Sequence, residues 1–145
     1  MRLTGRVALV TGGAHRVGKA IAVALAERGA RIAIHYHGAQ QDAEATVQQL
    51  RAAGGEAHAF QANLEDVSTF ATLIADVVQH FGSLDLLVNS AAMMQRTPIG
   101  EVTASQWDSM FALNLRAPFF LSQAACPHLA HAHGAIVNIA DLAAF

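Results

Sequence analysis

Apolar residues along this chain form two alternating patterns, short continuous runs and repeats at helical spacing. Val7–Val10 is a continuous apolar run, which is typical of a strand buried on both faces. Val17, Ile21 and Leu25 then recur at the spacing of one helix face. The same succession returns along the chain, and we expect further strands at residues 31–37, 56–61, 84–88 and 134–140, with helices at 42–53, 67–81 and 115–129.

Strands that alternate with helices of this length predict an α/β fold, in which a doubly wound parallel sheet is built with right-handed crossovers. We expect the Rossmann-like strand order 3-2-1-4-5 in one domain over residues 1–145, which ends after its fifth strand and leaves an apolar sheet edge there. Ligands bind such sheets in the crevice where the strand order reverses, here above the carboxyl ends of the first and fourth strands.

The helical segments of the second half carry two more specific expectations. Thr103 and Gln106 have the spacing of a capping box, which predicts a helix start at this point. That helix would direct Trp107 and Phe111 toward the core. We expect the next helix to be broken or bent at Pro118.

Composition narrows the classes of protein that fit this pattern. The chain has 145 residues, of which 53% are hydrophobic and 14% charged, so it is long enough and apolar enough to bury a core. The formal net charge of −2 gives no basic footprint for nucleic acid or an anionic membrane. The N-terminus leads directly into the first strand, and no apolar run reaches the length of a membrane span. We therefore expect a cytoplasmic protein with no nucleic-acid or membrane partner.

The cysteine and histidine residues show neither the pattern of a catalytic nucleophile nor that of a metal-binding site. Cys126 is the single cysteine, and we expect it to be a buried helix residue because no basic partner is arranged around it. His128, His131 and His133 lie at a helix end and turn without a carboxylate or cysteine set nearby. We therefore expect no metal site.

The segment Thr11–Gly18 joins the first strand to the first helix through a glycine-rich turn. Gly12 and Gly13 allow a positive φ and close backbone approach, and the helix that follows directs unpaired N–H groups into the turn. This arrangement favours a phosphate. Many strand–helix turns contain glycine for steric reasons alone, so the segment by itself does not establish a nucleotide site.

Two further motifs follow in order. Asn89-Ser90-Ala91-Ala92 comes directly after the fourth strand, and Asn114 lies in a later helical segment. With Thr11–Gly18, these motifs resemble the amino-terminal part of short-chain dehydrogenases/reductases, and the resemblance covers the whole chain. The family motif Thr-Gly-x-x-x-Gly-x-Gly is present with Arg16 in place of the middle glycine. Within the family, the residues most similar to pteridine reductases are Arg16, His35-Tyr36-His37 and Asp141.

The resemblance implies a dinucleotide-binding domain with a nicotinamide cofactor, and charge favours NADP(H). An NAD-preferring site usually places an acidic residue at the end of the second strand, where it bonds the ribose hydroxyls. Here that end reads His35-Tyr36-His37 without an acid, and Arg16, which we expect opposite it, offers a fork of donors to a 2′-phosphate. The alternative is that Arg16 is a solvated first-turn residue and the histidines are ordinary surface groups.

The resemblance also assigns roles to other positions. Asn63 stands where relatives have an aspartate that receives the adenine amino group, and its side-chain carbonyl can accept the same bond. Asn89 would support the turn beneath the nicotinamide ribose. The full set of expected cofactor-binding residues is Gly12, His15, Arg16, Val17, Gly18, His35, Tyr36, His37, Asn63, Leu64, Asn89, Ser90, Ala91 and Ile139.

Catalytic residues are implied only in part. Asn114 matches the family's helix asparagine, and Asp141 occupies the position of its serine. The only tyrosine is Tyr36 and the only lysine is Lys19, so the family's Tyr-x-x-x-Lys motif would lie beyond residue 145.

These residues lead to two hypotheses about function. The first is an NADPH-dependent oxidoreductase that reduces a pteridine or another C=N or C=O bond. On this hypothesis the chain is a fragment without turnover of its own, and its full-length relatives are homo-oligomers. The second is a non-catalytic dinucleotide-binding or regulatory module, or the product of a decayed gene.

Overall fold

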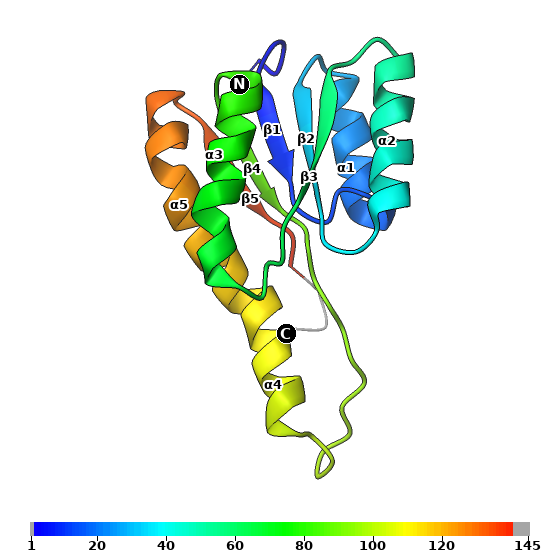
Figure 1. Cartoon of the computed structure of the whole chain (residues 1–145), viewed down its shortest axis with the longest axis vertical. Helices are drawn as coiled ribbons and strands as arrows, with labels where there is room; N and C mark the ends of the chain where they lie inside the picture. Colours follow the sequence, from blue (N-terminus) through cyan, green and yellow to red (C-terminus); the bar gives the residue numbers. More distant parts are fainter. Residues whose placement is uncertain (1, 141–145) are drawn as a thin grey trace.

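The computed structural model describes residues 2–140 and contains one parallel sheet of five strands in the order β3-β2-β1-β4-β5. This confirms the Rossmann-like α/β fold and the strand order that the sequence predicts. Figure 1 shows the sheet with the N-terminal helices on one side of the view and the long C-terminal helix on the other. The strands are β1 (Val7–Val10), β2 (Arg31–Tyr36), β3 (Ala57–Gln61), β4 (Leu86–Asn89) and β5 (Ala135–Asn138).

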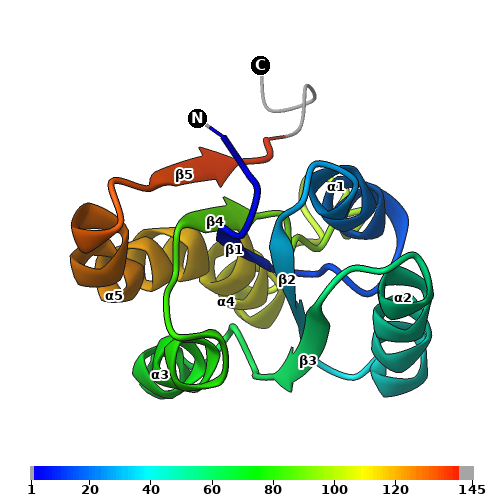
Figure 2. The same cartoon turned by 90° about the horizontal axis from the view of Figure 1, so that it is seen from above.

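Helices cover both faces of this sheet. They are α1 (Arg16–Ala26), α2 (Gln40–Ala52), the 3₁₀ turn η1 (Val67–Thr69), α3 (Phe70–Phe81), α4 (Ala104–Phe111), the π-helical turn η2 (Ala112–Arg116) and α5 (Ala117–His131). In Figure 2, α1 and α2 lie on one face of the sheet, and α3 and α5 lie on the other.

The core consists of two clusters, one on each face, because side chains of a strand alternate between faces. Val7 and Leu9 pack in the cluster beneath α3 and α5, whereas Ala8 and Val10 pack in the cluster beneath α1 and α2. All four side chains are at most 1% exposed. β1 is therefore apolar at every position because both of its faces are buried, as the sequence predicts.

The order of the strands brings three turns, which are distant in the sequence, together at one edge of the sheet. β1 pairs with both β2 and β4, and Val10 is in register with Ile34 on one side and Val88 on the other. The turns that follow these three strands therefore meet above their carboxyl ends. This is the point where the strand order reverses, as predicted from the sequence.

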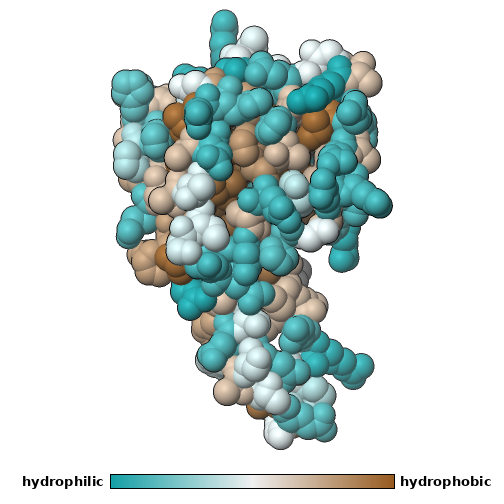
Figure 3. Space-filling model, viewed as in Figure 1, coloured by the Kyte–Doolittle hydropathy of each residue, from teal (hydrophilic) through white to brown (hydrophobic). Residues whose placement is uncertain are grey.

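Helix α4 differs from its predicted packing. The capping box of Thr103 and Gln106 is confirmed. Trp107 and Phe111 do not point into a core, however; they are 56% and 43% exposed. Their rings stack on each other, with centroids 4.3 Å apart. Figures 1 and 3 show α4 and the preceding loop as a narrow extension from the body, so the sheet does not lie beneath these two side chains.

Three local predictions for the helices were also wrong. Pro118 does not break α5, because it lies in the first turn of that helix, where no intrahelical bond needs its missing N–H. The irregular turn is instead η2, directly before it. Cys126 is exposed rather than buried. The helix predicted from residue 67 begins as the 3₁₀ turn η1, whose first turn is capped by the Asp66 carboxylate.

Strand β5 is the last strand in the sheet order, and each of its residues is exposed. Ile136 and Val137 are 40% and 42% exposed. The expected apolar edge is therefore present. Within residues 2–140, none of the helices has the length and apolar character that crossing a membrane would require.

Candidate functional site

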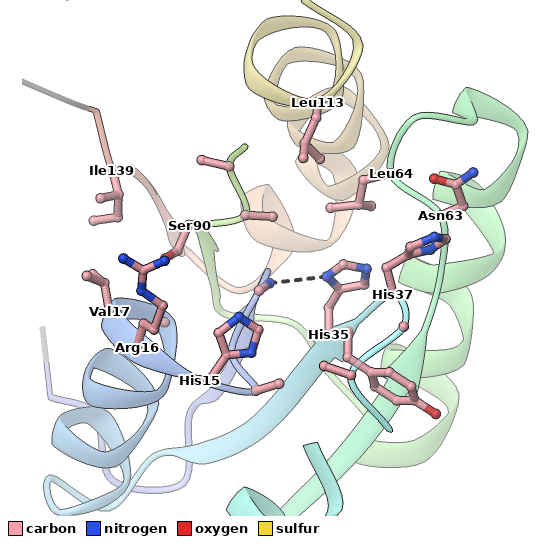
Figure 4. A pocket seen from close by; sticks show the side chains of 18 of the residues that line it. His15, Arg16, Val17, His35, His37, Asn63, Leu64, Ser90, Leu113 and Ile139 are labelled. Atoms are coloured by element: carbon pink, nitrogen blue, oxygen red, sulfur yellow. Dashed lines mark hydrogen bonds between the residues drawn. The ribbon is translucent and has the colours of Figure 1, made fainter. Parts of the chain in front are cut away.

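A cavity of about 620 Å³ lies above the carboxyl ends of β1, β2 and β4. Every expected cofactor-binding residue except Asn89 lines this cavity. These residues come from the turn after β1, the end of β2, the turn after β3, the turn after β4 and the end of β5. The structure therefore brings together residues that are up to 127 positions apart, from Gly12 to Ile139. Figure 4 shows side chains that line this cavity and labels ten of them.

Two glycines of the turn after β1 are required by their surroundings. Gly12 has a φ of +63°, and a Cβ there would lie 3.0 Å from the Cα of Ala91. A Cβ on Gly18 would collide with the carbonyl oxygen of Gly12. The first glycine thus lets the β1 turn touch the β4 turn, and the second lets α1 begin directly against the turn.

Thr11 joins the β1 turn to the β4 turn by hydrogen bonds. Its Oγ1 accepts from the backbone N–H groups of Ser90 and Ala91, each at 2.9 Å, and donates to the carbonyl oxygen of Val88 at 3.3 Å. Thr11 is 1% exposed, so it holds the floor of the cavity without facing it. It was part of the sequence motif but not among the expected site residues.

His35 has a supporting position that the sequence did not predict. Its ring is 3% exposed; Nδ1 accepts from the backbone N–H of Gly12 at 3.2 Å, and Nε2 donates to the carbonyl oxygen of Ala62 at 3.1 Å. The bond from Gly12 is drawn in Figure 4. Burial lowers the pKa of this imidazole to about 4, so it is neutral at pH 7. With both ring nitrogens bonded, His35 fixes the glycine turn and offers no cation to a phosphate.

Arg16, at the position of the family's middle glycine, takes a left-handed backbone conformation with a φ of +52°. Figure 4 shows its guanidinium on the side of the cavity where Ser90 and Ile139 lie, away from His37 and Asn63. We expected it opposite the end of β2 with its donors available there; the structure directs it elsewhere. Arg16 also lines a second cavity, which His15, His35 and His37 do not.

The turn after β3 forms the side of the cavity where the resemblance places the adenine. Leu64 is 4% exposed, whereas Asn63 is exposed to the cavity. The side-chain Oδ1 of Asn63 accepts from the backbone N–H of Glu65 at 3.0 Å. A carbonyl oxygen has two lone pairs, so Oδ1 retains one acceptor position.

The second cavity, of about 1170 Å³, lies between β5, α5 and the loop after β4. Asn114 lines it from η2, and its side-chain amide bonds the backbone of Met93 twice: Oδ1 accepts from N–H at 2.9 Å and Nδ2 donates to the carbonyl at 2.8 Å. Asn114 therefore fixes the loop beside this cavity. Asp141, the other expected catalytic residue, lies outside the described residues.

Asn89 lines the second cavity rather than the first. Its Nδ2 donates to Asn138 Oδ1 at 2.8 Å and to Ser122 Oγ at 3.2 Å. It is 5% exposed, so these bonds satisfy a buried amide and join β4 to β5 and α5. Its side chain thus supports the sheet at the boundary between the two cavities.

Several lining residues of the first cavity were not expected. Leu113 reaches it from η2, a position that no sequence motif indicated. The others are neighbours of expected residues in the same turns, so a wider window around each motif would have found them: Ala14, Gly38, Ala39, Glu65, Ala92 and Ala140. In the part of the chain that the structure describes, no three His, Cys, Asp or Glu side chains are grouped as metal ligands.

Known proteins are similar to this chain in both sequence and fold. Short chain dehydrogenase mdpC of Emericella nidulans is 40% identical over 136 residues, which are 94% of this chain and 51% of that protein. Versicolorin reductase 1 of Aspergillus parasiticus is 41% identical over 128 residues, 88% of this chain and 49% of that protein. The chain therefore spans about half the length of the curated relatives it matches.

A solved structure gives the same result. The crystal structure of a short chain dehydrogenase from Burkholderia cenocepacia in complex with NADP superposes with a TM-score of 0.89 and 38% identity, over 95% of this chain and 56% of that one. The family model for short chain dehydrogenases matches residues 6–145. This chain belongs to the short-chain dehydrogenase family.

Proposed function

We propose that the first cavity binds NADPH and that the chain is the cofactor-binding part of a short-chain reductase. The observation that carries this proposal is the turn at the floor of the cavity, where Gly12 and Gly18 let the turn after β1 pack against the turn after β4 and against the start of α1, more closely than a Cβ would permit. A glycine turn directly before a helix start is where the pyrophosphate of a dinucleotide meets backbone N–H groups. The NADP complex of the Burkholderia cenocepacia relative supports the same assignment.

Preference for NADPH over NADH is supported by the end of β2. In NAD-preferring sites an acid at this position bonds the ribose hydroxyls, and it would repel a 2′-phosphate. The described lining of this cavity has one acid, Glu65, which follows β3 rather than β2. Tyr36 and His37 at the end of β2 carry no negative charge at pH 7 to oppose a phosphate.

A bound nicotinamide dinucleotide supplies a hydride for reduction. The residues of this chain bind and orient it: Thr11 and His35 hold the glycine turn, Leu64 and Asn63 border the adenine side, and Asn114 fixes the loop beside the second cavity. We assign Asn114 and Asp141 to the catalytic side of the site by their match to family positions. Proton transfer in relatives also uses a Tyr-x-x-x-Lys motif, which residues 1–145 do not contain.

We further propose a substrate with a conjugated C=O or C=N bond. The second cavity shares Arg16 and Ile139 with the first. One wall of the second cavity is apolar and suits the apolar part of a conjugated substrate. This wall consists of Met93, Met94, Met110 and Phe119. The similarity of Arg16, His35-Tyr36-His37 and Asp141 to pteridine reductases supports a pteridine. The name of the versicolorin reductase relative supports a reductase with a different substrate.

The test is direct binding of NADPH to the 145-residue chain, measured by calorimetry, with a matched pair of glycine variants. Gly12→Ala should abolish binding, because its Cβ would press on Ala91 where the two turns meet. Gly38→Ala is the control: Gly38 lines the same cavity, but a Cβ there meets nothing within 4 Å. We expect it to bind as the parent does. Equal binding by all three chains, or none by the parent, would contradict the proposal.

The same preparation tests whether the chain acts alone. We expect no hydride transfer from NADPH to a carbonyl substrate above the buffer rate, measured by the decay of NADPH absorbance. Ordinary turnover by the 145-residue chain would show that the tyrosine and lysine of relatives are not needed here.

A further inference from the structure

The π-helical turn η2 borders both cavities. Leu113 lines the first cavity, and Asn114 lines the second and fixes its loop through Met93. Neighbouring residues of a helical turn point in different directions, so a third surface of the same turn remains. Arg116 lies on that surface and lines neither cavity. Its contacts therefore show what else η2 binds.

Arg116 joins η2 to the turn after β3. Its Nη2 donates a hydrogen bond to the backbone carbonyl oxygen of Glu65 at 2.8 Å, across 51 positions of the sequence. The guanidinium is charged, and a hydrogen bond from a charged donor is stronger than one between neutral groups. Ser109 of α4 adds a longer contact of 3.4 Å to the Glu65 carboxylate. In Figure 1 the chain between β3 and α3 meets the helix between the labels α4 and α5 at this place.

Hydrogen bonds within the turn after β3 fix its local shape. Asn63 Oδ1 accepts from the backbone N–H of Glu65 at 3.0 Å, and the carbonyl oxygen of Asn63 accepts from the backbone N–H of Asp66 at 3.0 Å. Both bonds are local, so they do not join the turn to the opposite side of the cavity. The bond of Arg116 makes that connection.

Leu64 and Leu113 lie near each other where the turn after β3 meets η2. Both line the first cavity, and Leu113 packs against the core cluster that contains Leu64. Figure 4 shows the two leucine side chains close together, with Asn63 beside Leu64. We call the part of the cavity that Asn63, Leu64 and Leu113 border the base end. Its apolar walls and its amide acceptor suit a flat heteroaromatic ring that carries an amino group.

We propose that Arg116 is a positioning residue for the cofactor: its bond to Glu65 holds the turn after β3 against η2 and so shapes the base end for the adenine of NADPH. This inference rests on the proposed function. Arg116 does not line the cavity, so it acts through the backbone of the turn rather than by touching the ligand. Without this bond the turn keeps its local shape, but Asn63 loses its fixed distance from Leu113.

Arg28 provides a matched control within the same chain. It is also exposed, and its Nη1 donates to the backbone carbonyl oxygen of Ala24 at 2.8 Å, the same length as the bond of Arg116. The bond joins Arg28 to the last turns of α1, and Arg28 lines neither cavity. Removing this side chain therefore measures the effect of an arginine–carbonyl bond that has no cavity behind it.

The experiment measures, by calorimetry on the 145-residue chain, the dissociation constants of NADPH and of its hypoxanthine analogue. The analogue carries a carbonyl oxygen in place of the adenine amino group, so it cannot donate to Asn63 Oδ1. The ratio of the analogue's constant to the NADPH constant should therefore be roughly ten in the parent. A general loss of affinity changes both constants alike, whereas a displaced turn lowers their ratio.

Arg116→Met keeps a long side chain but removes the donor. We expect the dissociation constant of NADPH to rise roughly fivefold and the ratio to fall to about two, because Asn63 is no longer held within reach of the base. Arg116→Lys keeps the charge and a donor, so it should restore the ratio to at least about five. Arg28→Met should match the parent in both values. Arg116 and Arg28 are exposed, so each variant should fold, which far-ultraviolet circular dichroism verifies.

The outcomes separate this inference from the proposed function. The inference is overturned, while NADPH binding stands, if Arg116→Met keeps the parent's ratio, if Arg116→Lys restores none of it, or if Arg28→Met loses it as well. A parent that binds both dinucleotides equally would also overturn it, because the base end would then not distinguish the adenine. If NADPH does not bind the parent chain, the proposed function fails and this inference fails with it.

Discussion

The strands β1 and β5 have similar apolar sequences but very different surroundings. Val7–Val10 of β1 lies between two neighbouring strands and beneath helices on both faces, and its side chains are at most 1% exposed. Ala135–Asn138 of β5 has one neighbouring strand, and every residue in it is exposed. An apolar run therefore predicts a strand, but its burial depends on how many elements the fold places around it.

The same contrast separates the two cavities. The first lies mainly above β1, β2 and β4, on turns that hydrogen bonds of Thr11 and His35 hold together, and Ile139 and Ala140 border it from the end of β5. The second is bordered by β5 and by exposed apolar side chains such as Phe119, which is 62% exposed. Within the described residues, the first cavity rests on turns fixed by hydrogen bonds, whereas the second is bordered by the exposed strand β5 and by exposed apolar side chains. We therefore propose cofactor binding, rather than turnover, for this chain.

The largest expected effect comes from truncating matched side chains of the two strands. Leu9→Ala should lower the free energy of unfolding by about 4 kcal/mol, because it leaves a cavity in a core where Leu9 is 0% exposed. Ile136→Ala should cost about 1 kcal/mol or less, because Ile136 is 40% exposed. Urea unfolding of both variants measures the two values.

Equal costs for the two substitutions would contradict the comparison and would indicate that β5 is covered in solution. A dilution series resolves that outcome, since self-association makes the unfolding midpoint depend on protein concentration.

The second effect is a pH dependence that arises from the cofactor side. Burial lowers the pKa of His35 to about 4, from the ordinary value of 6.5. Between these values the unfolded chain binds more protons than the folded chain, so this contribution to stability is complete above pH 6.5 and is lost as the pH falls toward 4. The total is roughly 3 kcal/mol.

Variants separate the contribution of His35 to this loss of stability from the contribution of the carboxylates, which also titrate at low pH. We expect the loss of stability between pH 6.5 and 4.5 to be smaller in His35→Asn than in the parent, measured by urea unfolding. His128→Gln, which changes a histidine of α5 that does not line the first cavity, should lose as much as the parent. If His35→Asn and the parent have the same slope, the imidazole is not buried in its neutral form.

Local patterns predicted most of the fold because each strand run and helix stripe is a short-range signal. The strand order followed from the succession of strands and helices, and the first cavity followed from the motif turns. The failures concern tertiary surroundings. Trp107 and Phe111 have the spacing of a buried stripe, but α4 extends past the sheet, so no core meets them.

The roles of His35 and Arg16 could not be predicted for the same reason. Both lie in motif segments, where the sequence predicts Arg16 as a donor to a phosphate and His35 as part of an acid-free end of the second strand. Only the fold places Gly12 N–H against the ring of His35. Likewise, the left-handed φ of Arg16 aims its side chain across the cavity, and nothing in the residue type reveals that direction.

The smallest expected effect compares backbone strain on the two sides. Two non-glycine residues in the described chain have a positive φ: Arg16 at +52° beside the cofactor turn, and His133 at +50° before β5. His133 lies directly after the end of α5 in a Schellman motif, where Gly134 N–H bonds Leu129 O at 2.7 Å, a position that glycine usually takes.

Arg16→Gly and His133→Gly should each raise the free energy of unfolding by about 1 kcal/mol, because glycine adopts this conformation without the clash of a Cβ. Urea unfolding measures the gain, and Arg28→Gly, at a position without a positive φ, should show none. A gain at His133 with a loss at Arg16 would mean that contacts of the arginine stabilise the fold. Gains in stability at both positions would mean that the backbone strain at Arg16 does not stabilise the fold. Such strain is expected at a residue that binds a ligand, here a ligand that extends from one cavity into the other.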